Sequence, residues 1–349
     1  MKNSIKKILL FHSSNDLYGS SRIFLKILDI LKDNYSIETM IPKGKLLSQK
    51  IISKKIKNSF HDVGIFRKKF INFFGLVNRF VINIKYIFYL VNYIKKNKIN
   101  LVYVNTSIML SPAIAATICG IPTVLHVHET FDFKNPKFFI YGKILNLFID
   151  YYFLVSSTVK TSWEYIISKK NFEIIENGFE FSPIYPKTIK SNKIIVSKIA
   201  RIMPRKGIFE FIKISHLISK KINDIEFHLY GDTLNEYEDY KKKLISYVNE
   251  NKLGNSIKFM GFNKNIKEIL NQSNFIFHLP IETESLPTSL VEAVLNKKPV
   301  IVSNNLGNLE VLENGNNGLV LEFKSLVNDT ESIINYFFNE KKQRKNIKN

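Results

Sequence analysis

Two glutamates eight residues apart, Glu284 and Glu292, carry the strongest chemical signal in this sequence. They enclose Glu-Ser-Leu-Pro-Thr-Ser-Leu-Val-Glu, in which Ser285 suits the N-cap of a helix and Pro287 its first turn. On such a helix the two carboxylates would lie about 12 Å apart. Carboxylates accept hydrogen bonds from hydroxyls, and free helix N–H groups bind phosphate. The segment therefore suits a nucleotide sugar, which carries hydroxyls at both ends of a diphosphate.

A basic loop upstream could bind the diphosphate itself. Arg201 and Lys206 lie in Ile-Ala-Arg-Ile-Met-Pro-Arg-Lys-Gly, at the end of an apolar run. Arginine offers a fork of N–H donors to a phosphate, lysine offers a point charge, and Gly207 allows a close turn into a helix. Each segment also has an interpretation in which it binds no ligand. The first would then be a basic loop with a turn glycine, and the two glutamates would lie on a solvated helix surface.

Bulk properties indicate two globular domains in a reducing compartment. The chain has 349 residues, 45% of them hydrophobic, and Cys119 is its single cysteine, so no disulfide can form within it. Its first residues are basic and then apolar, but the apolar run is too short for a signal peptide and is interpreted as a buried strand. The net charge of +21 favours anionic ligands, membranes or nucleic acid.

Short apolar runs alternate with helical segments, which predicts an α/β protein with parallel sheets covered on both faces. The pattern restarts after a proline-containing segment, which indicates a linker between two domains with a cleft between them. The expected parts are an N-terminal domain at 1–182, a linker at 183–192, a C-terminal domain at 193–330 and a C-terminal helix or tail at 331–349 that packs back towards the N-terminal domain. The expected strands lie at 5–11, 101–104, 123–127, 152–155, 193–199, 226–230, 257–260, 275–279, 300–302 and 319–321.

Together, the two polar segments resemble the family 4 retaining glycosyltransferases of the GT-B fold, also called glycosyl transferases group 1. Weaker matches follow in the same order along the chain: Ile175-Glu-Asn-Gly178, Tyr230-Gly-Asp232 and Phe259-Met-Gly261. The resemblance covers nearly the whole chain. It implies two Rossmann-like domains whose parallel sheets face a deep cleft.

The resemblance also implies a role for each matching position. Arg201 and Lys206 would hold the donor diphosphate and stabilise it as it leaves, Glu284 would bind hydroxyls of the transferred sugar, and Glu292 would bind the ribose. Backbone N–H groups around Thr288 would face the phosphates. The remaining donor-binding positions that it implies are Gly19, Phe262, Leu286 and Ser289.

A histidine in the first half completes the expected site. His128 lies in Leu-His-Val-His-Glu, just beyond a predicted strand, and the resemblance implies a histidine here beside the donor sugar. A neutral imidazole would accept a hydrogen bond from a sugar hydroxyl, and a protonated one would sit near developing phosphate charge. The expected catalytic set is His128, Arg201, Lys206 and Glu284. His126 is interpreted as a satisfied strand histidine.

One loop departs from the family pattern. Relatives carry two adjacent glycines and a nearby glutamate after the first strand, whereas this chain has Leu-Tyr-Gly-Ser-Ser-Arg with Gly19 alone. Direct contacts by Ser20, Ser21 and Arg22 therefore stay open. No cluster has metal-ligand spacing, and there is neither a Walker loop nor Gly-x-Gly-x-x-Gly, so no metal and no cofactor are expected; the nucleotide sugar is a substrate.

Residues 66–98 combine aromatic and basic side chains, and no acid occurs between Asp62 and Glu129. Arg79 and Lys85 interrupt the apolar character too often for a transmembrane helix. One interpretation is a helix, or two, packed on the sheet. The other is a membrane-surface helix that meets anionic lipid, and both can hold on different faces.

The sequence therefore predicts a retaining glycosyltransferase that uses a nucleotide-sugar donor and a lipid-linked glycan acceptor in cell-surface polysaccharide biosynthesis. It would lie in the cytoplasm, peripheral to the inner face of the cell membrane. One alternative is a GT-B nucleotide-sugar epimerase. From other classes, the alternatives are a basic nucleic-acid-binding protein and a non-catalytic sugar-binding protein. Zinc ligands and an aromatic RNA-binding motif are lacking, so no nucleic-acid partner is expected. The presence of Arg201, Lys206, Glu284 and Glu292 argues against a non-catalytic protein.

Overall fold

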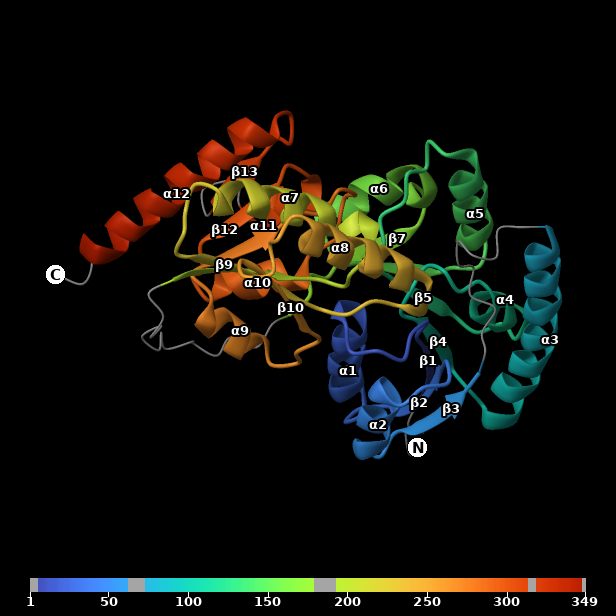
Figure 1. The fold of residues 1–349 in the computed structure, drawn as a ribbon. Coiled ribbons are helices and arrows are strands. Elements are labelled where there is room, and N and C mark those ends of the chain that lie inside the picture. The colour runs from blue at the N-terminus through green and yellow to red at the C-terminus, as the bar shows by residue number, and fades with distance from the viewer. Residues whose placement is uncertain (1–5, 62–72, 179–192, 313–317, 347–349) are drawn as a thin grey trace. The chain divides into compact units, whose positions relative to one another are not determined.

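The computed structural model describes residues 6–61, 73–178, 193–312 and 318–346 (Figure 1). The chain forms two compact units, 1–178 and 179–349. Each is built on a parallel sheet flanked by helices, which confirms the predicted α/β class and the two Rossmann-like domains. The expected linker at 183–192 lies outside the described residues.

The first unit contains a seven-stranded sheet in its described part, with the order β3-β2-β1-β4-β5-β6-β7. Apolar runs such as Ile8–Phe11, in β1, form the inner strands because both faces of the sheet are covered. Three strands were not predicted: β2, β3 and β7. The elements are β1 Lys7–Phe11, α1 Gly19–Leu31, β2 Ser36–Ile41, α2 Leu46–Ser53, β3 Lys57–Phe60, α3 Phe73–Asn97, β4 Leu101–Val104, α4 Ser111–Ile118, β5 Thr123–Val127, α5 Pro136–Asn146, β6 Tyr151–Leu154, α6 Ser157–Ile167 and β7 Asn171–Ile174.

The second unit has a six-stranded parallel sheet in its described part, with the order β10-β9-β8-β11-β12-β13. Three buried phenylalanines, Phe211, Phe227 and Phe277, meet edge to face in its core, with centroids 5.8–6.4 Å apart. The elements are β8 Ile194–Ile199, α7 Ile208–Ser219, β9 Ile225–Tyr230, α8 Glu238–Glu250, β10 Ile257–Gly261, α9 Ile266–Gln272, β11 Phe275–His278, α10 Thr288–Leu295, β12 Val300–Ser303, α11 Leu306–Val311, β13 Gly318–Leu321 and α12 Leu326–Asn346.

The C-terminal helix α12 packs on its own unit. Ile333 and Phe337 are buried in the core of the second unit, and the ring centroid of Phe337 lies 4.2 Å from that of Phe275. These apolar side chains anchor the first half of α12. Packing of residues 331–349 towards the N-terminal domain stays a prediction.

Helix α3 has one buried and one exposed face. Tyr86, Leu90 and Ile94 are buried against the rest of the first unit, while Ile84 and Phe88 face outwards, Phe88 with 69% of its surface exposed. No helix in the described part of the chain is both long enough and apolar enough to cross a membrane. The packed-helix interpretation therefore holds for the inner face of α3, and the exposed face remains available for another contact.

Candidate functional site

The polar residues of the second unit gather at the carboxyl ends of neighbouring strands. Arg201 lies two residues after β8, and Lys206 ends a short 3-10 turn, Pro204–Lys206, that leads into α7. Strand β8 lies between β9 and β11 in the sheet. The chain continues from β8 to β9 on one side, and β11 lies on the other side, so the strand order reverses at β8. Loops diverge at such a switch point, and ligands bind there in open α/β sheets.

Gly207 allows this loop to turn close to the end of β11. Its φ is +62°, and a Cβ atom at this position would lie 1.7 Å from the carbonyl oxygen of Leu279. A side chain is excluded by both the conformation and the contact. The glycine thereby holds Lys206 close to the loop that follows β11.

Lys206 and Glu284 form an ion pair in which the carboxylate is buried and the lysine is half-buried. Lys206 Nζ donates to Glu284 Oε1 at 2.6 Å, and His278 Nε2 lies 3.7 Å from Glu284 Oε2. Burial by itself would raise the pKa of Glu284, but Lys206 and His278 outweigh it and hold that pKa well below its usual range. Glu284 is therefore an ionised carboxylate with 8% of its surface exposed.

A fully buried lysine, Lys198, interacts electrostatically with this pair. Lys198, in β8, is 1% exposed, and burial lowers the pKa of its amine to about 7, against the attraction of Glu284. Burial also lowers the pKa of Lys206, again opposed by Glu284. The site therefore combines the Glu284 carboxylate with the amines of Lys206 and Lys198, and the carboxylate of Glu210 also attracts Lys198. This combination suits a ligand with both hydroxyls and negative charge. Sequence reasoning missed Lys198 and His278, because neither lies in a recognised motif.

The helix behind Glu284 begins later than predicted. Helix α10 starts at Thr288, and Pro287 occupies the N-cap position. The expectation that Ser285 caps the helix is wrong, because a residue before proline is disfavoured in helical conformation and Leu286 therefore stays outside the helix. Glu284 lies in the preceding loop, so the 12 Å helical spacing between the two glutamates does not apply.

Gly307 supports the loop that carries Glu284. A Cβ atom at Gly307 would lie 1.9 Å from the carbonyl oxygen of Glu284, so the start of α11 packs directly on this backbone. The neighbouring Asn308 is fully buried, and its Nδ2 donates to the carbonyl oxygen of Ser303 at 2.8 Å. Sequence reasoning did not single out either residue, although a glycine at a helix start suggests close approach.

The other predicted donor-binding residues of this unit lie on adjoining segments. Glu292 lies on α10 and is half-buried, and Phe262 directly follows β10 with an exposed ring. Leu286 lies in the loop before α10, Thr288 and Ser289 form the start of α10, and all three are half-buried. Lys206 and Glu284 are in direct contact, and the ligand contacts of the whole set stay predictions.

In the first unit, three polar residues follow the ends of three adjacent strands. His12 is the first residue after β1, Asn105 the first after β4, and His128 the first after β5. Asn105 lies between the two imidazoles: its Nδ2 is 3.1 Å from His12 Nδ1, and its Oδ1 is 3.1 Å from His128 Nε2. Gly19 begins α1, behind the loop that follows β1.

His128 and His126 lie with their ring centroids 4.3 Å apart. Burial, with smaller contributions from His126 and His12, holds the pKa of His128 well below its usual range. His126 is buried in β5, and the Tyr103 hydroxyl lies 2.7 Å from its Nδ1, as expected for a strand histidine. Both imidazoles are therefore neutral near pH 7. The expectation that His128 faces the donor sugar stays a prediction.

Glu129 fixes the loop after β4. Its carboxylate accepts from Thr106 Oγ1 at 2.6 Å, from Ser107 Oγ at 2.7 Å and from the Ser107 backbone N–H at 3.1 Å. These bonds hold the segment that carries Asn105 next to the end of β5. The sequence placed Glu129 beside His128 but gave no sign of its partners, which lie 22 and 23 residues away.

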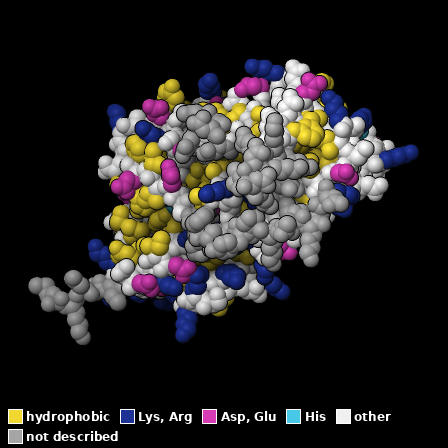
Figure 2. Space-filling model, turned by 90° about the vertical axis from the view of Figure 1, so that its left-hand side faces the viewer, with side chains coloured by type: hydrophobic (Ala, Val, Ile, Leu, Met, Phe, Trp, Pro, Cys, Tyr) yellow, Lys and Arg dark blue, Asp and Glu magenta, His cyan; other side chains and the backbone are white. Residues whose placement is uncertain are grey.

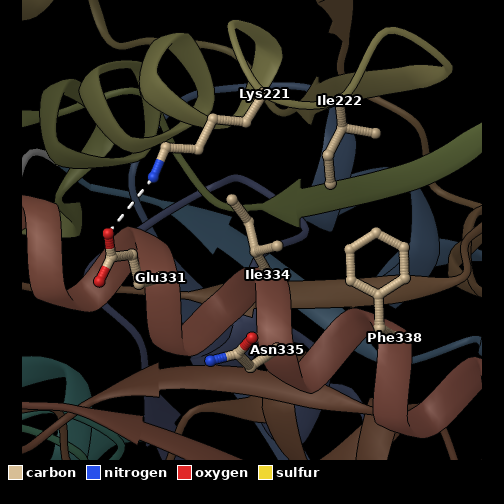
Figure 3. Close-up of a pocket in the computed structure, with 6 residues that line it drawn as sticks. All are labelled: Lys221, Ile222, Glu331, Ile334, Asn335 and Phe338. Carbon is tan, nitrogen blue, oxygen red and sulfur yellow. Dashed lines mark hydrogen bonds and ion pairs between the residues drawn. The ribbon is translucent and has the colours of Figure 1, made fainter.

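A groove with a volume of about 330 Å³ lies elsewhere on the second unit (Figure 3). Lys221 and Ile222, after the end of α7, form one side, and α12 forms the other, where Glu331 lies 3.5 Å from Lys221. Because α7 returns the chain to the start of β9, this groove lies towards the amino ends of the strands. It is therefore distinct from the Lys206–Glu284 site.

Two family models match consecutive parts of the chain. The model described as Glycosyltransferase Family 4 matches residues 51–182, and that described as Glycosyl transferases group 1 matches residues 184–349. An Escherichia coli protein, UDP-Gal:alpha-D-GlcNAc-diphosphoundecaprenol alpha-1,3-galactosyltransferase, is 25% identical over 271 residues, which cover 69% of this chain and 66% of the relative. A Staphylococcus aureus poly(ribitol-phosphate) alpha-N-acetylglucosaminyltransferase is 26% identical over 181 residues, covering 51% of this chain and 33% of the relative.

Solved structures share the fold. Anabaena Alr3699/HepE in complex with UDP and glucose superposes with a TM-score of 0.74 at 22% identity, covering 94% of this chain and 90% of that one. This likeness confirms the GT-B fold. The chain spans between one third and two thirds of the length of the two curated relatives above.

Proposed function

We propose that this chain, which belongs to the group 1 glycosyltransferases, is a retaining enzyme that moves a sugar from a nucleotide-sugar donor to a lipid-linked glycan in cell-surface polysaccharide biosynthesis. The observation that carries the proposal is the Lys206–Glu284 ion pair at the switch point of the second sheet. It unites in one place the two chemistries that a nucleotide sugar needs: a cation for the diphosphate and a carboxylate for sugar hydroxyls.

In this proposal Lys206 and Arg201 neutralise charge that builds on the diphosphate as the sugar departs. Such stabilisation accelerates the reaction when it strengthens in the transition state. Glu284 orients the sugar through its hydroxyls, and Glu292 binds the ribose. The leaving diphosphate accepts the proton of the incoming hydroxyl on the same face of the sugar, which retains the anomeric configuration. The work of the protein is then positioning and charge stabilisation.

The relatives suggest the substrates to test first. Structural neighbours hold UDP, UDP-glucose, or UDP with glucose, and the E. coli relative is named for transfer of galactose to a GlcNAc-diphosphoundecaprenol. We therefore propose a UDP-hexose donor and a polyprenyl-diphosphate-linked glycan acceptor. Both substrates carry a diphosphate, which agrees with the net charge of +21.

The proposal is tested by incubating the full chain with a panel of nucleotide sugars and measuring the thermal shift, since a ligand stabilises the fold that binds it. The donor that stabilises the protein is then offered with a synthetic polyprenyl-diphosphate N-acetylglucosamine, and NMR of the product gives its anomeric configuration. An α-glycoside from an α-linked donor is the expected product. An inverted product would contradict the retaining mechanism, and an epimerised nucleotide sugar without a new glycoside would establish the epimerase alternative.

The nucleic-acid alternative has less support. On the coloured part of the face in Figure 2, Lys and Arg side chains alternate with Asp and Glu side chains, and no continuous basic stripe follows that face. A nucleic-acid surface requires cations gathered along the path of the phosphates. A non-catalytic sugar-binding role is less consistent with Lys206, because a cation beside a bound diphosphate stabilises the leaving group.

We also propose that the first unit attaches to an anionic membrane surface at the inner face of the cell membrane. The exposed face of α3 carries Ile84 and Phe88, with Lys85, Lys95 and Lys96 exposed nearby along the same helix. Aromatic and aliphatic side chains enter the lipid interface, while lysines meet anionic headgroups. Residues 66–72 of the predicted surface, with Phe66 and Phe70, lie outside the described residues.

Helix α5 adds a second surface of the same kind to the first unit. Its sequence has no acidic residue, and Lys137 and Lys143 are exposed. Its exposed apolar residues are Phe138, Phe139, Ile140, Ile144 and, at the C-cap, Leu147 with 73% of its surface exposed. Two basic helices with exposed apolar side chains are unusual on a freely soluble surface and fit a lipid interface.

A further inference from the structure

A hydrogen-bonded chain of five side chains runs through the first unit and ends at His128. Asp16 Oδ1 lies 2.8 Å from Ser21 Oγ, and Ser21 Oγ lies 2.9 Å from His12 Nε2. His12 Nδ1 lies 3.1 Å from Asn105 Nδ2, and Asn105 Oδ1 lies 3.1 Å from His128 Nε2. We propose that this chain fixes the tautomer of His128, with Asn105, His12, Ser21 and Asp16 acting as positioning residues.

Asp16 sets the direction of hydrogen-bond donation along these five side chains. The Asp16 carboxylate also accepts from Ser14 Oγ at 2.5 Å and from the Tyr18 backbone N–H at 3.0 Å, so it acts as an acceptor. Ser21 has one hydroxyl hydrogen and donates it to Asp16. His12 must therefore carry its proton on Nε2 to donate to Ser21, which leaves a lone pair on His12 Nδ1.

The orientation of the Asn105 amide determines which nitrogen of His128 carries the proton. Its Nδ2 group donates to the lone pair of His12 Nδ1, and the second hydrogen of Nδ2 points to the carbonyl oxygen of Ser20 at 3.4 Å. A carbonyl oxygen accepts only, so the opposite amide orientation would oppose two acceptors. Asn105 Oδ1 then faces His128 and accepts a hydrogen bond from Nε2–H.

Nδ1 of His128 is consequently a lone-pair acceptor. Burial lowers the pKa of His12 to about 4 and that of His128 well below its usual range, which agrees with two neutral rings. Within the part of the chain that the structure describes, no hydrogen bond occupies His128 Nδ1. This nitrogen would accept a hydrogen bond from a hydroxyl of the bound sugar, a role that rests on the function proposed above. The chain thus selects a hydroxyl donor at this position.

The tautomers are measured by long-range proton–nitrogen NMR of histidine-labelled full chain, without any substrate, after assignment with single histidine variants. The expected result is Nε2–H in both His12 and His128. An Nδ1–H tautomer in either ring would overturn the inference. Because no substrate is present, this readout is independent of catalysis. If both rings carry Nε2–H but the protein has no transferase activity, the hydrogen-bonded series is confirmed and the proposed function is wrong.

Two variants at Asn105 separate positioning from packing. Asn105→Leu removes the acceptor, so His128 should populate both tautomers, and transfer should fall about tenfold at unchanged donor affinity, the scale of one lost hydrogen bond. Asn105→Asp keeps an acceptor for His128 Nε2–H and should keep that tautomer, while His12, now facing a carboxylate at Nδ1, should protonate there. Tyr103→Phe, which removes a buried hydrogen bond to the neighbouring His126, is the matched control and should leave the His128 tautomer unchanged. The inference would be contradicted if His128 lost its Nε2–H tautomer in Tyr103→Phe. It would also be contradicted if His128 kept only that tautomer in Asn105→Leu.

Discussion

Lys206 Nζ and Glu284 Oε1 lie 2.6 Å apart although their residues are 78 positions apart in the sequence. The contact joins the loop after β8 to the loop after β11, two neighbouring strands in the centre of the second sheet. Each residue therefore has a structural task, which is to neutralise the other within a buried site. Each also has a proposed catalytic task, and the following prediction separates the two.

Lys206→Met should lower both stability and turnover, because Glu284 loses its closest cation. Breaking a buried ion pair on one side costs about 3–5 kcal/mol. The double variant Lys206→Met/Glu284→Gln removes both charges and should regain part of the stability while staying inactive. Urea unfolding followed by circular dichroism, with donor turnover measured below the transition, tests this. A double variant that regains turnover would show that the pair is only structural.

Glu292→Ala should weaken donor binding without unfolding the protein, since Glu292 is half-buried on α10 and is proposed to bind the ribose. A lost hydrogen bond to a charged group costs about 1.5–3 kcal/mol, or roughly 10- to 150-fold in affinity. Calorimetric titration with the donor nucleotide measures the change. Glu250→Ala, at the exposed end of α8, is the control and should bind normally. Wild-type affinity in a folded Glu292→Ala protein would remove the ribose assignment.

His128→Ala should reduce sugar transfer strongly while binding of the donor nucleotide largely survives. The reason is that His128 follows β5 in the first unit, whereas the proposed diphosphate ligands Arg201 and Lys206 belong to the second. Steady-state transfer and nucleotide titration give the two values. His61→Ala, a histidine of the same unit beyond β3, should transfer at the wild-type rate. Equal transfer by both variants would refute a role for His128.

The first unit should lose stability as the pH falls from 6.5 towards 4. Burial lowers the pKa of His12 and of His126 from 6.5 to about 4, so unfolding takes up protons in this window, and the loss disappears above pH 6.5. Between pH 7.5 and 5 each histidine should cost about 2 kcal/mol. Trp163, the single tryptophan and fully buried in this unit, reports its unfolding in urea. His126→Phe should flatten the pH dependence, and an unchanged slope would contradict this account.

Binding to anionic vesicles should depend on α3 and should decrease only in part at high salt. Screening shortens the reach of charges from about 10 Å at 0.1 M to about 3 Å at 1 M, whereas the apolar contribution of Phe88 persists. Vesicle sedimentation at both salt concentrations measures the two parts, and Phe88→Ser should remove the salt-resistant one. Equal binding to neutral and anionic vesicles would remove the electrostatic part, and binding to neither would remove the proposed attachment.

Local sequence was sufficient for the fold class and for all six strands described in the second unit. Continuous apolar runs such as Val300–Val302, in β12, form inner parallel strands, because a strand covered on both faces favours apolar side chains at successive positions. The edge strands β3 and β7 were missed because their residues are mostly exposed or half-buried and so lack that signal. Helix α10 was predicted too early, since proline restricts the residue before it and shortened the helix at Thr288.

The types of the site residues were set by the sequence, and their partners by the tertiary structure. Glu284, Lys206 and His128 stood out by motif and by position after strands. Their contacts did not. The His128–Asn105 and Lys206–Glu284 contacts join the ends of neighbouring strands from residues 23 and 78 positions apart. The Glu284–His278 contact depends on how the loop after β11 folds back onto the end of its own strand. Burial is also a property of the folded sheet, and it is burial that lowers the pKa of His128 and of Lys198. The sequence thus determined which groups are present, whereas the packing of the strands decided their protonation and their direction of hydrogen bonding.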